Sequence, residues 1–539
     1  MLFRSSPFLN PLAHFHRHCC QSLQCRGLPQ SSKADFCGTA ERIFRRCGYN
    51  LPLNSSNPPP VPRLQLRSVA SVSTLTHSLD PELQVADVLP CFAGEPFLLL
   101  LDSAARHRQR DSRYSMLTAD PRAVCRLDSV NYGSQPFAQL RQWQQLLSAV
   151  ALPADAPPFC GGIAGLLSYE LGHAFERLPG PAVNDTQTPA LLAGLFDWAI
   201  VWDHLEKSVQ IFVLNLPTDS GLTPATTDRL GWILRQLQRP AQSVVSSAVP
   251  DSRQPSGRLH QIEPTSQIYS DFTREEYLDA VARVIEYIRA GDIFQANLSQ
   301  RLMTPWQSSA IDLYQRVRRQ NPAPFCGLLQ YEDTAIISAS PERFLKVASP
   351  GLVETRPIKG TRRRHKSPIA DLFAGNELAA SEKDRAENVM IVDLLRNDIS
   401  RACRPGSVQV TGLCEIERFE TVLHLVSTVL GELQPGRDVW DLLAGCFPGG
   451  SITGAPKIRA MEIIAELERS VRGAYCGSLF ACGPAGDFDS SILIRTFTLQ
   501  SGWLYFPVGG GIVADSDPLD EYRETLHKAS GLIRCLRTS

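Results

Sequence analysis

Short runs of apolar residues, bounded by glycine, proline and polar turn residues, recur along the chain after about residue 83. Such runs predict buried β-strands, and clear examples are Phe97–Leu101, Tyr114–Leu117 and the glycine-rich segment Gly161–Tyr169. Two further runs, Leu195–Asp203 and Val209–Leu214, are separated by a few polar residues and predict a β-hairpin. The pattern therefore predicts a strand-rich first half of the ordered sequence.

A helical period appears in the second half, where predicted strands alternate with helices. Thr273 is suited to capping a helix and Gly291 to ending it; the apolar residues on one face of that helix are Tyr277, Val281, Val284, Ile285 and Ile288. Proline favours the first turn of a helix. We therefore expect three more helices, over about 377–402, from Pro456, and from Pro518 towards Arg537.

The first 79 residues have a different composition from the rest of the chain. They contain nine Lys and Arg residues, two acids and many Ser and Pro residues, with no sustained hydrophobic period. This composition predicts a disordered or targeting segment. This composition is compatible with an organellar transit peptide, with a family-specific tail and with an over-extended gene start. We expect a cytoplasmic protein, or one in a plastid or other organelle if the segment is a transit peptide.

The remaining chain divides by composition into three parts. Residues 80–238 form an N-terminal region, residues 239–266 are rich in Pro, Ser and Gln and predict a linker or insertion, and residues 267–539 form a C-terminal region that holds the candidate site residues described below. A net charge of −1 argues against a nucleic-acid partner, and the apolar runs are too short to span a membrane. The 15 cysteines include no Cys-x-x-Cys pair, which argues against a zinc site and for a reducing compartment.

Lys359 lies between a proline and a glycine in the segment Pro357–Thr361. Proline restricts the backbone and glycine allows a close approach by a ligand. A lysine held there is a candidate nucleophile if its surroundings lower its pKa. The alternative is a solvated lysine in a turn.

Two pairs of acids have helical spacing. Asp384 and Glu387 are three residues apart on one predicted helix, and Glu521 and Glu524 are three apart on another. Together they could hold Mg²⁺, which prefers carboxylate oxygens and waters. Solvated helix faces with salt bridges, such as Glu524 to Lys528, are the alternative.

Glycine-rich segments and one arginine are candidates for anion binding. Gly449–Lys457 precedes a helix start, where free backbone N–H groups favour an anion, although capping by Thr453 is an ordinary alternative. Gly509, Gly510 and Gly511 follow a predicted strand and could present N–H groups to a carboxylate. Arg495 ends another strand and could clamp a carboxylate or pair with a neighbouring acid.

Taken together, these motifs resemble those of the chorismate-utilising enzymes, over about Leu83 to the C-terminus. The matching segments are Ser340–Phe344, Ser381–Asn388 with Ile391–Asp398, Gly449–Lys457, Ile494–Thr496 and Gly509–Asp515. The resemblance implies an α+β fold in which two large antiparallel β-sheets pack as a sandwich with flanking helices.

Two positions discriminate within this family. Lys359 matches the lysine of aminodeoxychorismate synthases, whereas anthranilate synthases have alanine there. Gln295 stands where isochorismate and salicylate synthases have the lysine that activates water. The resemblance therefore implies amination of chorismate at C4, giving 4-amino-4-deoxychorismate for 4-aminobenzoate and folate synthesis. Anthranilate synthase activity is the alternative, and a subunit without catalytic activity is a third hypothesis.

The resemblance also implies residue roles. Lys359 would attack C2 of chorismate, and Glu342 would act as general acid for the leaving hydroxyl. Mg²⁺ would be held by Glu387 and Glu524, with support from Asp384 and Glu521. The expected substrate-binding residues are Arg495, Tyr475, Thr453, Gly509, Gly510, Gly511, His424 and Lys528.

Ammonia would come from a separate glutamine amidotransferase subunit, because no cysteine lies in a Gly-x-Cys-x-Gly setting. Leu99–Ser103 lies where anthranilate synthases carry their tryptophan-binding motif, with Asp102 in place of Glu. The resemblance implies at most a structural tryptophan there.

Overall fold

The structure, a computed structural model, describes residues 72–105, 112–180, 183–216, 228–239, 255, 259–263, 267–419 and 422–537. Leu66–Ser539 form one compact unit. Most of the expected N-terminal extension and most of the expected linker lie outside the described residues. Strand β1 (Val72–Leu79) falls within the expected extension, and it pairs with β9 of the larger sheet. No described helix is long and apolar enough to cross a membrane.

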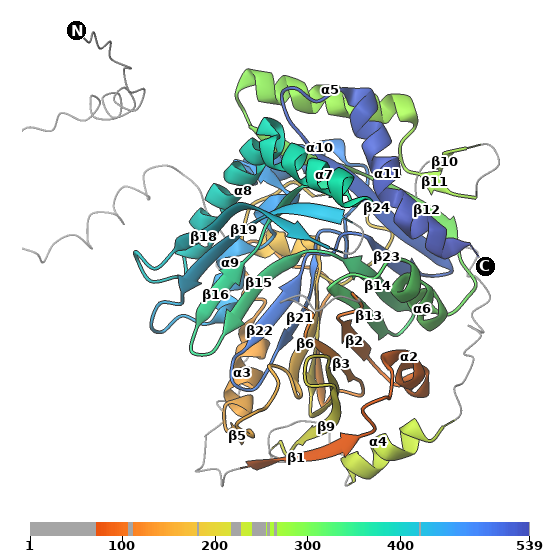
Figure 1. Cartoon of the computed structure of the whole chain (residues 1–539), viewed down its shortest axis with the longest axis vertical. Coiled ribbons are helices and arrows are strands. Elements are labelled where there is room, and N and C mark those ends of the chain that lie inside the picture. Colours follow the sequence, from red (N-terminus) through yellow and green to blue (C-terminus); the bar gives the residue numbers. More distant parts are fainter. Residues whose placement is uncertain are drawn as a thin grey trace, which may run out of the picture. The chain divides into compact units, whose positions relative to one another are not determined.

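Two large β-sheets, antiparallel apart from a short parallel β1–β5 pairing, form the framework of the described residues (Figure 1). The 14-stranded sheet runs β10 (His260–Gln261), β11 (Tyr269–Ser270), β12 (Gln295–Pro305), β24 (Trp503–Ile512), β23 (Thr496–Gln500), β14 (Thr334–Ser340), β13 (Phe325–Tyr331), β2 (Leu98–Asp102), β3 (Tyr114–Thr118), β8 (Trp198–Asp203), β9 (Ser208–Leu214), β1 and β5 (Val150–Ala151), with β20 (Gly454–Ala455) beside β12.

The 10-stranded sheet runs β17 (Ile358–Arg363), β19 (Val422–Glu432), β16 (Leu352–Thr355), β15 (Arg343–Ala348), β22 (Phe488–Ser491), β21 (Ser478–Cys482), β6 (Gly162–Leu167), β7 (Leu191–Phe196) and β4 (Ala123–Leu127), with β18 (Gln409–Arg418) beside β19. Strands from residues 80–238 and from residues 267–539 occur in both sheets. The two regions are therefore interleaved in space.

The main core lies between the two sheets. Along β2, Leu99 belongs to this core, as does Ile163 of β6, whereas Leu98 and Leu100 belong to a second core on the outer side of the larger sheet. Successive strand residues point to opposite faces, so a strand with helices on one side and a sheet on the other must be apolar throughout. The continuous apolar run around β2 has this cause.

Helices cover the outer faces of the sheets (Figure 1). Their bounds are α2 (Val85–Val88), η2 (Leu89–Phe92), α3 (Ala138–Leu147), η3 (Tyr169–Ala174), α4 (Arg229–Leu237), α5 (Arg274–Ala290), α6 (Ala310–Gln320), α7 (Pro368–Ala380), α8 (Glu382–Ser400), α9 (Val439–Cys446), η4 (Gly450–Ile452), α10 (Lys457–Leu467) and α11 (Pro518–Leu536). Helix α5 confirms the predicted caps, because Thr273 forms a capping box and Gly291 has φ 85°. The prediction of two antiparallel sheets with flanking helices is confirmed.

The helix expected over 377–402 is wrong as a single element. Ser381 has an extended backbone and separates α7 from α8, and its hydroxyl accepts a hydrogen bond from the Asp384 amide (3.3 Å). Serine is a favoured N-cap because its oxygen satisfies a free N–H of the first turn. As a result, α8 begins just before Asp384.

Candidate active site

Lys359 lies on β17 at the edge of the smaller sheet, half-buried. The β17–β19 register shifts between Lys359 and Thr361, and Gly360 has φ 78°. A Cβ at Gly360 would lie 2.9 Å from Leu378 Cδ1 and 3.0 Å from Asp384. Glycine therefore permits both the positive φ and the close packing of α7 and α8 on this strand.

Charged groups from three parts of the chain surround the Lys359 amine. Burial lowers the pKa of Lys359, Glu387 and Glu342 oppose that change, and Lys528 reinforces it. A lowered pKa increases the neutral fraction of the amine, which is the form that attacks carbon. The structure thus brings together the predicted nucleophile and three other predicted site residues.

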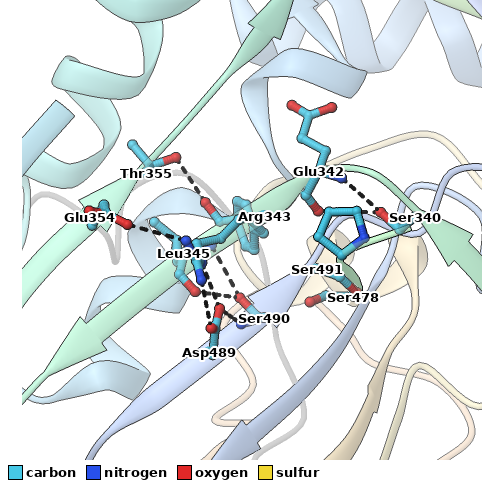
Figure 2. A network of polar contacts seen from close by, with 12 residues as sticks. Ser340, Glu342, Arg343, Leu345, Glu354, Thr355, Ser478, Asp489, Ser490 and Ser491 are labelled. Carbon is cyan, nitrogen blue, oxygen red and sulfur yellow. Dashed lines mark hydrogen bonds and ion pairs between the residues drawn. The ribbon is translucent and has the colours of Figure 1, made fainter. Parts of the chain in front are cut away.

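Glu342 immediately precedes β15 and is 6% exposed. Burial raises its pKa to about 7, although Lys359 and a hydrogen bond from the Ser451 hydroxyl (3.1 Å) act in the opposite direction. Figure 2 shows the Glu342 side chain pointing away from the neighbouring polar network, in which Arg343 pairs with Asp489 at 2.9 Å. A carboxyl group with this pKa can hold and donate a proton near neutral pH.

The four predicted metal ligands are divided between α8 and α11. Burial raises the pKa of Glu387, and both Asp384 and Glu524 contribute to that rise. Burial acts to raise the pKa of Glu524 as well, but Lys528, whose Nζ lies 2.7 Å from Glu524 Oε1, lowers it overall. Carboxylates of the two helices therefore face the same space.

The other two acids have partners of their own. Arg362 approaches Asp384 Oδ2 at 3.3 Å, and the Ser516 hydroxyl donates to Glu521 Oε1 at 2.6 Å. Among the described residues, no group of three or more His, Cys, Asp or Glu side chains is arranged to hold a metal ion. Mg²⁺ often takes only one or two protein carboxylates with waters and an anionic substrate group. Two carboxylates such as those of Glu387 and Glu524 would therefore be sufficient protein ligands for a site of this kind.

Arg495 lies in a bend just before β23, not at the end of a strand as predicted, and Tyr475 is buried in the turn before β21. Arg495 has φ 55°, a left-handed conformation that costs a non-glycine residue roughly 1 kcal/mol or more. Burial lowers the pKa of Arg495, while Tyr475 and Glu524 oppose that effect. Such strain is common at functional sites, and Arg495 brings a half-buried cation to this one.

His424 lies on β19, opposite Thr361 of β17. Its Nδ1 is 2.9 Å from the Thr361 hydroxyl, and burial lowers the pKa of His424 to about 4. The ring is therefore neutral at pH 7. It can exchange hydrogen bonds with a substrate, but it adds no positive charge.

The predicted position of the triple glycine after a strand is wrong, because Gly509–Gly511 lie within β24, paired with β12. The amide of Ser299, opposite Gly509, donates to Glu468, and the amide of Asn297, opposite Gly511, donates to the Thr453 carbonyl. In an antiparallel pair, residues whose amides point away from the partner alternate with residues that bond to it.

The N–H groups of Gly509 and Gly511 therefore point away from β12, and that of Gly510 points towards it. The Lys528 amine accordingly donates to the Gly509 carbonyl at 2.9 Å. A Cβ at Gly510 would lie 3.1 Å from Glu521 Oε2 and 3.6 Å from Glu524 Oε1. The absence of a side chain at Gly510 thus leaves space beside the carboxylates of Glu521 and Glu524.

Thr453 is fully buried, and its hydroxyl donates to the Gly449 carbonyl at 3.0 Å. Its single hydroxyl proton is therefore engaged in the loop. Ser451, in the same loop, is a residue that the sequence reasoning missed, and it contacts Glu342 directly. A serine in a glycine-rich motif was the available signal, but its partner lies 109 residues away.

Asp102 lies at the end of β2 and is buried. Its carboxylate accepts hydrogen bonds from Ser115 (2.6 Å), Tyr314 (2.7 Å) and Arg318 (2.7 Å). Both carboxylate oxygens are thus bonded to the protein itself.

Comparisons with known proteins identify the family of this chain. A family model described as chorismate binding enzyme matches residues 97–534. Aminodeoxychorismate synthase component 1 of Klebsiella aerogenes is 38% identical over 460 residues, covering 83% of this chain and 95% of its own length. Anthranilate synthase component 1 of Streptomyces coelicolor is 41% identical over 410 residues, covering 75% of this chain and 78% of its own length.

A solved structure, anthranilate synthase component I from Streptococcus pneumoniae TIGR4, matches with a TM-score of 0.66 at 30% identity, covering 79% of this chain and 93% of its own. The family model covers the part of the chain in which all the candidate site residues lie, from Glu342 to Lys528. This chain therefore belongs to the chorismate-binding enzyme family.

Proposed function

We propose that this protein aminates chorismate at C4 to give 4-amino-4-deoxychorismate, with Mg²⁺ as cofactor and ammonia from a separate glutamine amidotransferase. Relatives named for this reaction and relatives named anthranilate synthase are about equally similar to the chain, so overall identity does not choose between them. The proposal rests on Lys359, a half-buried amine whose pKa is lowered and which lies near Glu342 and Glu387.

In the proposed reaction, the neutral Lys359 amine forms a bond to C2 of chorismate. The two ring double bonds shift, and the bond from C4 to its hydroxyl breaks. Protonated Glu342 gives its proton to the departing oxygen, which leaves as water. Ammonia then forms a bond to C4, the double bonds shift back, and the bond between C2 and Lys359 breaks. Lys359 leaves as its neutral amine, and the new amine at C4 gives one proton to Glu342, which returns to its protonated form.

Other residues of the site would bind and orient the substrate. Arg495 supplies positive charge, and the N–H groups of Gly509 and Gly511, which point away from β12, are hydrogen-bond donors for a carboxylate. Glu387 and Glu524 would hold Mg²⁺, which when bound neutralises a substrate carboxylate. A second subunit as the source of ammonia is consistent with the words "component 1" in the relatives' names.

Product analysis tests the proposal directly. We expect the purified protein, given chorismate, MgCl₂ and ammonium at pH 8, to form aminodeoxychorismate without pyruvate, as followed by liquid chromatography and mass spectrometry. Anthranilate with an equal amount of pyruvate would instead assign anthranilate synthase activity. The absence of turnover under these conditions would favour a subunit without catalytic activity.

The metal dependence of the rate tests the acid pair. Glu387→Gln and Glu524→Gln should each raise the Mg²⁺ concentration for half-maximal rate by at least roughly tenfold, because loss of a direct carboxylate ligand costs more than about 1.4 kcal/mol. Asp384→Asn should have a smaller effect, since Arg362 already pairs with Asp384. Glu382→Gln, an exposed change at the start of α8, is the control. Equal effects from Glu382→Gln and Glu387→Gln would contradict a metal site at Glu387.

A further inference from the structure

Arg472 is a buried arginine outside the residues assigned above, 6% exposed. Its Nε and Nη2 donate to the two oxygens of Glu468 at 2.8 and 2.7 Å, its Nη1 donates to the Ile452 carbonyl at 2.9 Å, and Nη2 also donates to the Asn297 carbonyl at 2.6 Å. The Tyr169 ring lies 4.6 Å from its guanidinium carbon. One planar group thus joins several separate segments.

The acceptors of these bonds belong to elements that form the site. Ile452 is the last residue of η4, whose terminal carbonyl groups need partners outside the helix. Asn297 lies on β12, opposite Gly511. Glu468 is itself fixed to β12, because the amide and hydroxyl of Ser299 donate to its Oε1 at 2.9 and 2.7 Å. Arg472 therefore fixes the end of η4 to β12.

The residue before Ile452 is Ser451, which donates to Glu342. We propose that Arg472 is a positioning residue for Glu342: by fixing η4, it keeps the Ser451 hydroxyl in hydrogen-bond contact with the general acid. Arg472 itself does not contact Glu342. This inference rests on the proposed role of Glu342.

Arginine is required here because of its shape. Its five N–H donors lie in one plane and can bond a carboxylate and two carbonyls together, whereas lysine presents one small ammonium on a flexible chain. Lysine in this position can keep the charge beside Glu468 but cannot make all four bonds. Arg472→Lys therefore separates the geometry from the charge.

The groups that face Glu342 define the readout. They are the Lys359 amine and the Ile358 amide from β17, Ser451 from η4, and Cys476, whose own pKa is raised in part by Glu342. The Ser451 hydrogen bond lowers the pKa of Glu342. Loosening η4 should therefore move the ionisation of Glu342 to higher pH.

The test is a double-mutant cycle read from pH–rate profiles of Arg472→Lys, Ser451→Ala and the double variant. We expect each single variant to move the ionisation near pH 7 upward by about 0.5 unit or more, as expected for loss of roughly 0.7 kcal/mol of hydrogen bonding to the carboxylate. The double variant should move no further than Ser451→Ala alone. The KM for chorismate should stay close to the wild-type value, because the hydrogen bonds of Arg472 go to Glu468 and to backbone carbonyls.

Arg459→Lys, on the exposed side of α10, is the matched control and should leave the profile unchanged. Thermal unfolding is measured for every variant, and Glu468→Gln replaces Arg472→Lys in the cycle if the latter does not fold. An unshifted pH–rate profile in a folded Arg472→Lys or Glu468→Gln variant, or additive shifts in the double variant, would overturn the inference. Wild-type protein that does not turn over chorismate would instead reject the proposed function.

Discussion

Replacing Lys359 by alanine should reduce formation of 4-amino-4-deoxychorismate by roughly 10³-fold at saturating chorismate and ammonium. The alanine side chain cannot form the bond to C2, so only direct attack by ammonia remains. Arginine at this position should be equally inactive, because its guanidinium stays protonated and is a poor nucleophile. The measurement is the initial rate of product formation, followed by chromatography.

The matched control is Lys366→Ala, which removes an exposed lysine a few residues further along the same segment. It should retain the wild-type rate. A second measurement looks for the intermediate itself: with ammonia omitted, intact mass spectrometry of the wild type should find an adduct equal to chorismate less one water, and Lys359→Ala should lack it. A Lys359→Ala enzyme with the wild-type rate would rule out covalent catalysis by this residue.

Replacing Glu342 by glutamine should lower kcat by about 10²- to 10⁴-fold, the usual contribution of a positioned general acid. Glutamine has nearly the same shape but has no proton to give to the departing hydroxyl. The ionisation near pH 7 in the wild-type pH–rate profile should be absent from the variant, because it reports Glu342, whose pKa is raised to about 7. A variant that keeps this ionisation would assign it to another group.

The raised pKa of Glu342 also predicts how the stability of the protein depends on pH. The folded protein holds the Glu342 proton up to about pH 7, whereas the unfolded chain releases it at an ordinary pKa of 4.5. Between these values the folded state binds more protons than the unfolded state, so the free energy of unfolding falls as pH rises. Relative to Glu342→Gln, the wild type should lose up to about 3 kcal/mol over this range. Urea unfolding of both proteins at pH 4.5, 6 and 8 measures this difference. If the free energy of unfolding depends on pH in the same way in both proteins, the raised pKa of Glu342 is contradicted.

Local sequence signals determined several of the helices and strands. Thr273 and Gly291 marked both ends of α5, and Pro518 marked the start of α11, because caps and proline act on the backbone within a single turn. Apolar runs marked the strands for the same local reason. The motif around Lys359 and the position of Glu342 were likewise sufficient to propose a nucleophile and an acid before any contact was known.

Tertiary structure decided which of these groups can act. The pairing of Asp384 with Arg362, the hydrogen bond from Ser451 to Glu342 and the orientation of Gly509 join residues separated by tens to hundreds of positions. No local period encodes such contacts, since they depend on the order of strands in the two sheets. The pKa values of Lys359 and Glu342 also depend on removal from water, which occurs only when the chain has folded. The sequence alone therefore determined the chemical groups and their local elements, and the fold determined their partners, their exposure and so their protonation.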